Sequence, residues 1–504
     1  MTMMSKKKLS QEAFDAAVED LVDGLGLEIE EAIESACEEF EIQGFCLDGI
    51  VKQKGGAEVL AKLPTAMAAA ALKAALQGEK EALRSAVGSL GKELEEAANK
   101  EDTDEAARLL LASAKADAAE LLLTCVDKAE SEKDADLLTQ SLSALLRQLS
   151  SDHARDHLVQ ENGPRRLVAL LEAAGDEDQE ARRVLLLRVC AASMAEQEEG
   201  KCGYMSWGLP KIIAGRLASF QGKADKDSLE ACCQCVKGIL TADDTRPTPL
   251  AMEAQFGGEF AKALSMDKDG VTASLLSCLG RVARECSETG WDPDVRECAR
   301  QVALGLKKIA LNDEICKKFV EDSPVCVPTL LSFMTSSARD PKGKEVFQAV
   351  LQLLRQVSAC DTVKKELVER DATEALCDLL EDHERMRSAG ERPGGLGTVA
   401  IQSVLYVLTN MTLRSPDVAE RLADLGGFDR VRQVEASYPD KPKLLRQCCL
   451  LVRNSAVRSA KVREVLLKGG MEAVVRRVKE RHADQCGDVC AAALRDMGLA
   501  DYNA

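Results

Sequence analysis

The sequence predicts an all-α solenoid, a fold in which short helices stack along one axis rather than around a single globular core. Eight helical stretches end in the same local pattern, and their third residues recur at intervals of 43, 47, 70, 48, 54, 44 and 42 residues. Such a recurrence is typical of a helical repeat array. Aromatic residues make up only 3% of the chain, which favours closely packed helices over sheets. The aligned third residues are Gln148, Ala191, Gly238, Lys308, Gln356, Asn410, Asn454 and Asp496.

A complete repeat unit is best seen at residues 417–457. We predict a short first helix over Asp417 to Leu422. A tight corner between helices needs a positive φ, which Gly426-Gly427 can adopt. Phe428 to Val434 predicts the second helix and Leu444 to Val457 a long third one. The following unit repeats this order around Gly469-Gly470. We therefore expect about eight units of three helices each.

Three helices in a unit, with a glycine corner between the first two, resemble the armadillo repeat. The related HEAT repeat has two longer helices and no short first one. The resemblance implies a right-handed armadillo-repeat solenoid of about eight units, preceded by an N-terminal helical extension.

Three regions are predicted along the chain. Residues 1–54 hold two acidic amphipathic helices, with Phe14 and Val18 on one apolar face and a glutamate-rich surface that is solvated, docks a basic partner or folds back on the solenoid. Residues 55–102 contain a hinge around Pro64 and an Ala-rich helical run whose apolar face is weak. The solenoid, residues 103–504, begins near Thr103.

Two insertions interrupt the array. One follows Gly238 and accounts for the interval of 70 residues, and the other covers Met386 to Gly397, which is rich in Arg, Gly and Pro. Long loops of this kind usually lie on the surface and often carry function.

Both ends of the chain resemble a more specific family. The stretch Ser10 to Val18, the run Phe40 to Lys52 and the closing stretch Ala493 to Gly498 are similar to the armadillo repeat-containing protein 6 family. The similarity covers the two ends and the repeat register, whereas Met67 to Ala98 shows no match. The resemblance implies a non-catalytic protein without a well-defined biochemical activity, and it assigns no binding site.

The nineteen cysteines are expected to pack as small apolar residues. Cys232 and Cys235 form a CxxC spacing, but no second pair follows, and with only four histidines the chain is poorly supplied for a zinc site. An odd cysteine count without an export signal indicates a reducing compartment, so we expect a cytoplasmic protein, with the nucleus left open. No apolar run is long enough to predict a membrane span.

No sequence motif predicts catalysis or a cofactor. Gly394 to Gly397 lacks the GxGxxG spacing of a dinucleotide site, and Gly175 to Asp178 lacks the ligand order of an EF-hand loop. No histidine lies beside a recognisable nucleophile motif. We therefore expect neither an enzyme nor a bound cofactor or metal.

The position just before each aligned third residue is unusually basic. Six of the eight residues there are Lys or Arg, although only 66 of 504 residues are basic and the net charge is −18. If they face the groove lined by the third helices, that groove favours an extended acidic partner. Alternatively, each cation stabilises a helix C-terminus or pairs with a carboxylate of the adjacent unit. Both interpretations stay open. The residues are Arg147, Cys190, Lys237, Lys307, Arg355, Thr409, Arg453 and Arg495.

The aligned Asn410 and Asn454 could grip the main chain of an extended peptide, because an amide both donates and accepts hydrogen bonds. The alternative is local bonding within the helices. Tryptophans expected of a nuclear-import adaptor one turn earlier are absent, and so are the aromatic platforms that stack nucleic-acid bases. The predicted partner-binding residues are therefore Arg147, Lys237, Lys307, Lys308, Arg355, Asn410, Arg453 and Asn454.

Two functions fit these observations. The first is a scaffold or adaptor that holds an extended, acidic partner segment in the concave groove. The second is an assembly factor or chaperone-like protein that binds its client through the insertion loops and the convex surface.

Overall fold

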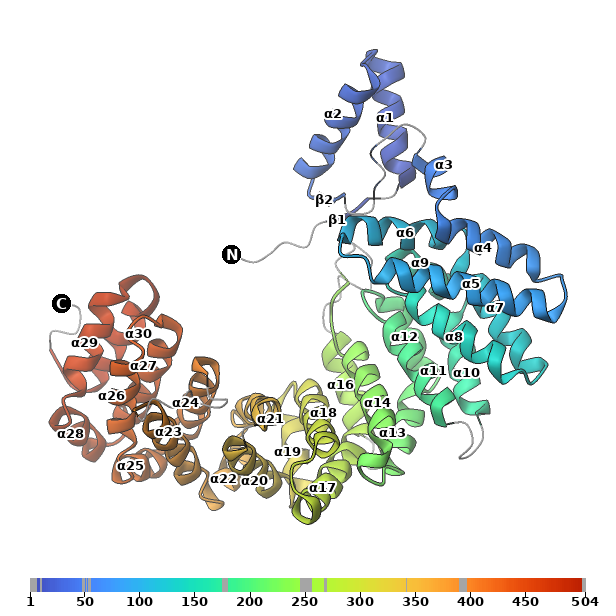
Figure 1. Ribbon diagram of the computed structural model, residues 1–504. Coiled ribbons are helices and arrows are strands. Elements are labelled where there is room, and N and C mark those ends of the chain that lie inside the picture. The colour runs from blue at the N-terminus through green and yellow to red at the C-terminus, as the bar shows by residue number, and fades with distance from the viewer. Residues whose placement is uncertain are drawn as a thin grey trace. The chain divides into compact units, whose positions relative to one another are not determined.

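The computed structural model describes residues 7–9, 11–47, 50, 52, 56–174, 180–244, 256–266, 270–340, 342–388 and 397–500 (Figure 1). The chain forms two compact units, Met1–Ile213 with Gln234–Phe260 and Ala214–Cys233 with Ala261–Ala504. The described part of the chain is almost entirely helical, which confirms the predicted all-α class.

The N-terminal residues of the first unit form a helical hairpin. Helices α1 (Gln11–Leu25) and α2 (Ile29–Ile42) pack on each other through a core that includes Phe14, Val18 and Ala32. The short strands β1 (Lys7–Lys8) and β2 (Phe45–Cys46) pair in parallel beside it. The two predicted amphipathic helices are thus confirmed.

The helices that follow the hairpin come in triplets of a first, a second and a third helix. In the first unit the complete triplets are α3 (Gly56–Ala61), α4 (Pro64–Ala75) and α5 (Lys80–Ala98); α6 (Thr103–Lys115), α7 (Ala118–Ser131) and α8 (Ala135–Gln148); and α9 (Asp152–Gln160), α10 (Gly163–Ala173) and α11 (Glu180–Ser193). Helices α12 (Glu198–Ser206), α13 (Leu209–Ala218) and α14 (Lys226–Ile239) form the next triplet.

The Ala-rich run proves to be a repeat triplet. Helix α5 packs on α8, and α3 packs on α6, as the helices of later triplets pack on their successors. Leu83, Val87, Leu90 and Leu94 of α5 are fully buried, and the alanines of α4 permit a close approach. The three-helix pattern therefore starts at Gly56, one triplet before the predicted start near Thr103. The domain limits 1–54, 55–102 and 103–504 stay a prediction.

The second unit continues the same pattern. Its triplets are α16 (Phe256–Met266), α17 (Val271–Thr289) and α18 (Pro293–Ile309); α19 (Asp313–Glu321), α20 (Cys326–Arg339) and α21 (Lys344–Val357); α22 (Asp361–Glu369), α23 (Ala372–Ser388) and α24 (Thr398–Thr412); α25 (Pro416–Asp424), α26 (Gly427–Ser437) and α27 (Pro442–Ala456); and α28 (Ala460–Lys468), α29 (Met471–Arg481) and α30 (Ala483–Asp496). Helix α16 contributes residues to both units.

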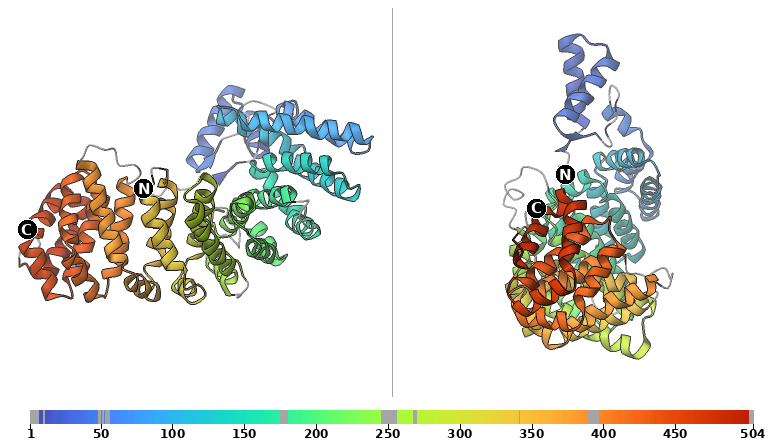
Figure 2. Two further views of the ribbon diagram at one scale, coloured as in Figure 1. Left: turned by 60° about the horizontal axis from the view of Figure 1, so that its bottom comes forward. Right: turned by 90° about the vertical axis from the view of Figure 1, so that its left-hand side faces the viewer.

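All eight aligned stretches lie at the C-terminal ends of third helices, which confirms the repeat register. In the second unit, the third helices pack on one another in chain order: α18 on α21, α21 on α24, α24 on α27 and α27 on α30 (Figure 2). Equivalent positions on successive third helices are therefore neighbours in space.

The predicted glycine corners are present. Gly426 and Gly470 have φ values of 68° and 75° and lie between the first and second helices of their triplets. Asn162 and Asp371 take the same left-handed conformation at the same place in two other triplets. A short polar side chain tolerates this backbone almost as well as glycine does, so the corner is kept where the glycine is lost.

The cysteines behave as apolar packing residues, as predicted. Most of those described are buried, and none of the described cysteines forms a disulfide. Burial raises the pKa of the Cys326 thiol to about 12, which keeps it protonated. The described residues contain no group of three or more potential metal ligands, and no described helix could cross a membrane.

Several predicted features lie outside the described residues. These are residues 175–179, residues 389–396 of the second insertion, and residues 245–255 and 267–269 of the first.

Candidate partner-binding site

The third helices of the second unit present one stripe of partly or fully exposed residues, which we call the third-helix face. On each helix these residues recur every three or four positions, as expected for one side of a helix. The stripe is made by Arg300, Leu304, Lys307 and Lys308 on α18; Gln348, Gln352 and Arg355 on α21; Gln402, Tyr406 and Asn410 on α24; Arg446, Leu450 and Arg453 on α27; and Asp488, Ala492 and Arg495 on α30.

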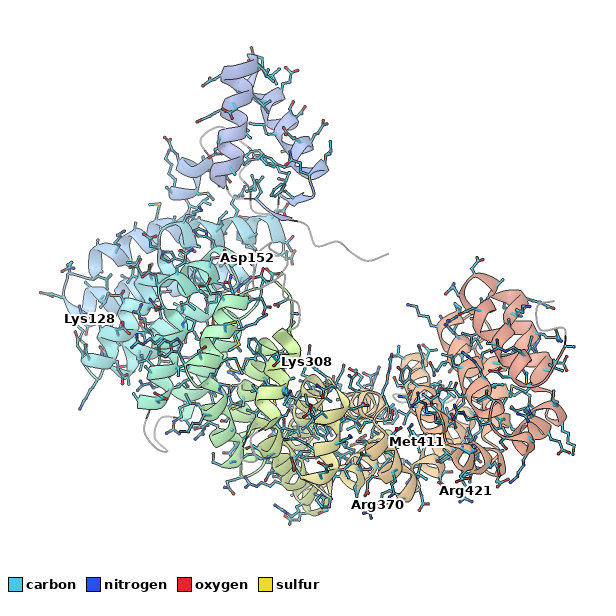
Figure 3. The ribbon with its side chains drawn as sticks, turned by 180° about the vertical axis from the view of Figure 1, so that it is seen from behind. Lys128, Asp152, Lys308, Arg370, Met411 and Arg421 are labelled. Atoms are coloured by element: carbon cyan, nitrogen blue, oxygen red, sulfur yellow. The ribbon has the colours of Figure 1, made fainter. Side chains whose placement is uncertain are left out.

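Three cations gather at one end of this face, where α18 meets α21. This cation cluster consists of Lys307, Lys308 and Arg355, of which Lys308 is labelled in Figure 3. Partial burial lowers the pKa of Lys307, and the positive charges of Lys308 and Arg355 lower it further. The three like charges therefore lie together where α18 packs on α21.

Neutral groups on the next helix hold two of these cations in place. The ammonium Nζ of Lys307 donates a hydrogen bond to Oε1 of Gln352 at 2.5 Å. The guanidinium of Arg355 lies over the ring of Tyr406, 4.2 Å from the ring centre, in a cation–π contact. Neither Lys307 nor Arg355 forms an ion pair with any residue that the structure describes. Lys307 and Arg355 are therefore held in place by neutral groups rather than by carboxylates.

The opposite end of the third-helix face is neutralised by its own carboxylates. Arg453 donates from Nε to Oδ2 of Asp496 at 3.2 Å, and Asp496 is only 10% exposed. Arg446 binds Asp488 through two parallel hydrogen bonds of 2.5 and 2.7 Å, and the guanidinium lowers the pKa of that carboxyl to about 2. Arg453 thus lies on the predicted face but already has an acidic partner.

The two predicted cations of the first unit differ in the same way. Arg147 donates to Oε2 of Glu95, on the preceding third helix, at 3.1 Å. Lys237 is exposed near the end of α14, and no ion pair joins it to a described residue. The structure therefore shows carboxylate pairing for Arg147 and Arg453 but not for Lys237, Lys307 or Arg355. Use of any of these residues by a partner stays a prediction.

Both predicted asparagines donate to the preceding third helix. Nδ2 of Asn410 donates to Oγ of Ser358 at 2.9 Å and to the carbonyl of Arg355 at 3.4 Å. Nδ2 of Asn454 donates to the carbonyl of Thr409 at 3.3 Å. These carbonyls belong to the last turns of α21 and α24, where no intrahelical N–H is left to bind them. Both amides therefore bond across to the preceding third helix rather than within their own helix, and a role of Asn410 and Asn454 in holding a partner stays a prediction.

A different surface lies on the second helices of this unit. Helices α17 and α20 enclose a hollow of about 540 Å³, in which Trp291 packs edge to face on Phe333 at 5.1 Å. Val325 at its rim is 55% exposed. This is an apolar feature away from the third-helix face.

Sequence reasoning missed the role of Tyr406. The signal that could have found it is an aromatic residue one turn before the aligned residue of one unit, combined with an arginine in the unit before it.

Comparison with known proteins supports the fold and the family. The profile described as Armadillo repeat-containing protein 6 N-terminal domain matches residues 6–74. Armadillo repeat-containing protein 6 of Pongo abelii is 25% identical over 407 residues, 75% of this chain and 71% of that protein. The protein of the same name from Homo sapiens is 25% identical over 405 residues, with the same coverage.

A solved structure extends the similarity of the fold to nearly the whole chain. The crystal structure of an engineered protein aligns with a TM-score of 0.59 over 97% of this chain and 99% of its own, at 17% sequence identity. The predicted resemblance is confirmed: this protein has an armadillo-repeat fold and is similar to armadillo repeat-containing protein 6, and its residues 6–74 match the N-terminal domain of that family.

Proposed function

We propose that the protein is a non-catalytic interaction scaffold that binds an extended, acidic segment of a partner protein on the third-helix face of the second unit. The observation that carries the proposal is the cation cluster, because it collects positive charge in a chain with a net charge of −18. The family resemblance and the armadillo fold support the general role of a scaffold.

The geometry of the cluster suits an anionic ligand. Gln352 and Tyr406 hold Lys307 and Arg355 in place, so less side-chain freedom is lost when a ligand binds. Burial and the like charges of Lys308 and Arg355 lower the pKa of Lys307, and an incoming carboxylate relieves the like-charge repulsion. Arg355 uses the face of its guanidinium on Tyr406, which leaves N–H donors at the edge for a two-pronged contact with a carboxylate.

A binding assay with charge-reversed variants tests the proposal. A fluorescent peptide rich in glutamate should bind the wild-type chain, and its affinity should fall steeply with added salt. The double variant Lys307→Glu/Arg355→Glu should reduce this affinity by at least about tenfold. The matched control is Lys365→Glu/Lys468→Glu, which makes the same charge change at two exposed first-helix residues. Equal losses in the two double variants, or binding that is insensitive to salt, would contradict the proposal.

The hollow between α17 and α20 favours a second candidate, a chaperone-like assembly factor that binds a client through its second helices and insertion loops. Under this alternative, Val325→Asp or removal of Met386 to Gly397 abolishes client binding, while Lys307→Glu/Arg355→Glu leaves it intact. The opposite pattern supports the scaffold. We place either activity in the cytoplasm, with the nucleus as the open alternative, because the described cysteines are free thiols.

A further inference from the structure

An exposed aliphatic residue follows three of the third helices in the second unit. Leu311, Leu413 and Val457 come three residues after the aligned positions of α18, α24 and α27 and are 44%, 44% and 47% exposed. Ala359 holds the same position after α21. We call the row of Leu311, Ala359, Leu413 and Val457 the turn edge.

The fold itself does not require an exposed aliphatic residue here. In the first unit the same position holds Ser151 and Met194, which are buried, and Thr241, which is half-buried. In the second unit the residues just before the turn edge, including Ala310 and Ala456, are buried, whereas the turn-edge residue itself faces water. Single exposed aliphatic residues are ordinary on protein surfaces, but three at equivalent positions form a row.

Two exposed cations adjoin this row. Arg414 follows Leu413 and Arg458 follows Val457, and both are exposed. Within the described part of the chain, neither forms an ion pair, although Arg414, after Lys364, helps to lower the pKa of the Asp361 carboxyl. Since α24 packs on α27, the two Leu/Val-Arg pairs are neighbours. The turn edge therefore combines apolar surface with positive charge and continues the charge of the cation cluster.

We infer that the partner segment is amphipathic as well as acidic, with carboxylates on the cation cluster and with aliphatic or aromatic side chains covering Leu413 and Val457. The inference rests on the proposed function and specifies its ligand. Positive charge on both the third-helix face and the turn edge selects an acidic segment, because a basic or neutral one leaves these cations unpaired.

The helical rise and the alternation of side chains in an extended segment allow one segment to contact both the cation cluster and the turn edge. The turn edge lies three residues beyond the aligned positions, which corresponds to about 4.5 Å along the helix axis. Side chains of an extended segment point alternately to opposite sides. A segment that crosses the C-terminal ends of the third helices can therefore direct one set of side chains to the cations and the other set to the turn edge. The expected signature is alternation of acidic and apolar residues.

Two peptides of equal charge test the inference. In one, glutamate alternates with valine, and in the other, glutamate alternates with serine. The wild-type chain should bind the Glu/Val peptide about tenfold more tightly, because burying aliphatic surface adds to the shared electrostatic attraction. The difference should persist at high salt, where the charge contribution is screened.

The variant Leu413→Ser/Val457→Ser should bind both peptides with the weaker affinity. Its matched control is Val368→Ser/Leu467→Ser, at two first-helix residues that are each 39% exposed, and it should preserve the tenfold preference. All four side chains are exposed, so circular dichroism should show a retained fold in both variants.

Equal affinity for the two peptides, or a preference that Leu413→Ser/Val457→Ser leaves unchanged, would overturn the inference and leave the proposed function standing. Failure of the wild-type chain to bind either peptide would overturn the proposed function as well.

Discussion

The two ends of the third-helix face in the second unit place the same kind of residue at the same position, yet they differ in charge. Arg355 and Arg453 occupy equivalent positions on α21 and α27. The helix that follows α21 offers Arg355 an aromatic ring, whereas the helix that follows α27 offers Arg453 the carboxylate of Asp496. The repeat position thus determines where a cation lies, and its neighbour determines whether the charge is available to a ligand.

The largest effect is expected from giving the cation cluster a carboxylate of its own. The substitution Gln352→Glu is nearly isosteric and places an acidic oxygen where Oε1 now accepts from Lys307. It should weaken binding of a glutamate-rich peptide by about tenfold, or roughly 1.4 kcal/mol, measured by fluorescence anisotropy. Gln433→Glu, at an exposed residue of α26, is a control with the same change in charge. An unchanged affinity in Gln352→Glu would show that the absence of a carboxylate partner at Lys307 is irrelevant.

A smaller loss is expected when Arg355 keeps its charge but loses its stacking. Arg355→Lys removes the planar guanidinium that lies on Tyr406 and should weaken the same peptide about threefold, since exposed cation–π contacts contribute roughly 0.5–1 kcal/mol. In the combination Tyr406→Leu/Arg355→Lys the two losses should not add, because both remove one contact. Full additivity would argue that Tyr406 does not orient Arg355. Arg453→Lys, at the neutralised end, should have little effect on binding.

Removing a carboxylate from the neutralised end should leave its cations available to a ligand, as they are in the cation cluster. Asp496→Asn removes the carboxylate that Arg453 and Arg495 share. We expect a gain in affinity for acidic peptides of about twofold to threefold, accompanied by a small loss of thermal stability. A loss of affinity that matches the loss of stability would mean that Asp496 acts only through the fold.

The asparagines should affect stability rather than binding. Asn454→Ala removes the hydrogen bond to the carbonyl of Thr409 and should lower the free energy of unfolding by about 0.5–1.5 kcal/mol, measured by denaturant titration. Peptide affinity should change by less than about twofold. A clear loss of affinity without loss of stability would restore the predicted role of this amide in gripping a partner's main chain.

The smallest effect is a dependence of stability on pH that arises at Lys307. Its pKa is lowered in the folded chain, so between that lowered value and the ordinary lysine value of about 10.5 the unfolded chain binds more protons. Stability contributed by this site therefore rises with pH through that window, and the repulsive cost is fully present below it. NMR titration of Lys307 should show the lowered pKa, and addition of an acidic peptide should raise it. An unshifted pKa in the free protein would remove the evidence for repulsion in the cluster.

The sequence by itself determined the repeat register, the three-helix unit, the glycine corners and the packing role of the cysteines. Each of these depends on local properties, namely periodicity, backbone freedom at residues such as Gly426 and the apolar character of a thiol. The Ala-rich triplet at Gly56 to Ala98 was missed, because its helices are stabilised mainly by neighbours across the repeat rather than by a strongly apolar face.

Only the tertiary structure decided which predicted site residues have free charge. The partners that distinguish Lys307, Arg355 and Arg453 lie between 43 and 51 residues away, on the next third helix. The partners of Asn410 and Asn454 are also distant in sequence, because their amides donate hydrogen bonds to the preceding third helix. Position in a repeat is a property of one segment, whereas compensation of a charge or of a hydrogen-bonding group belongs to a pair of segments and appears only when they pack.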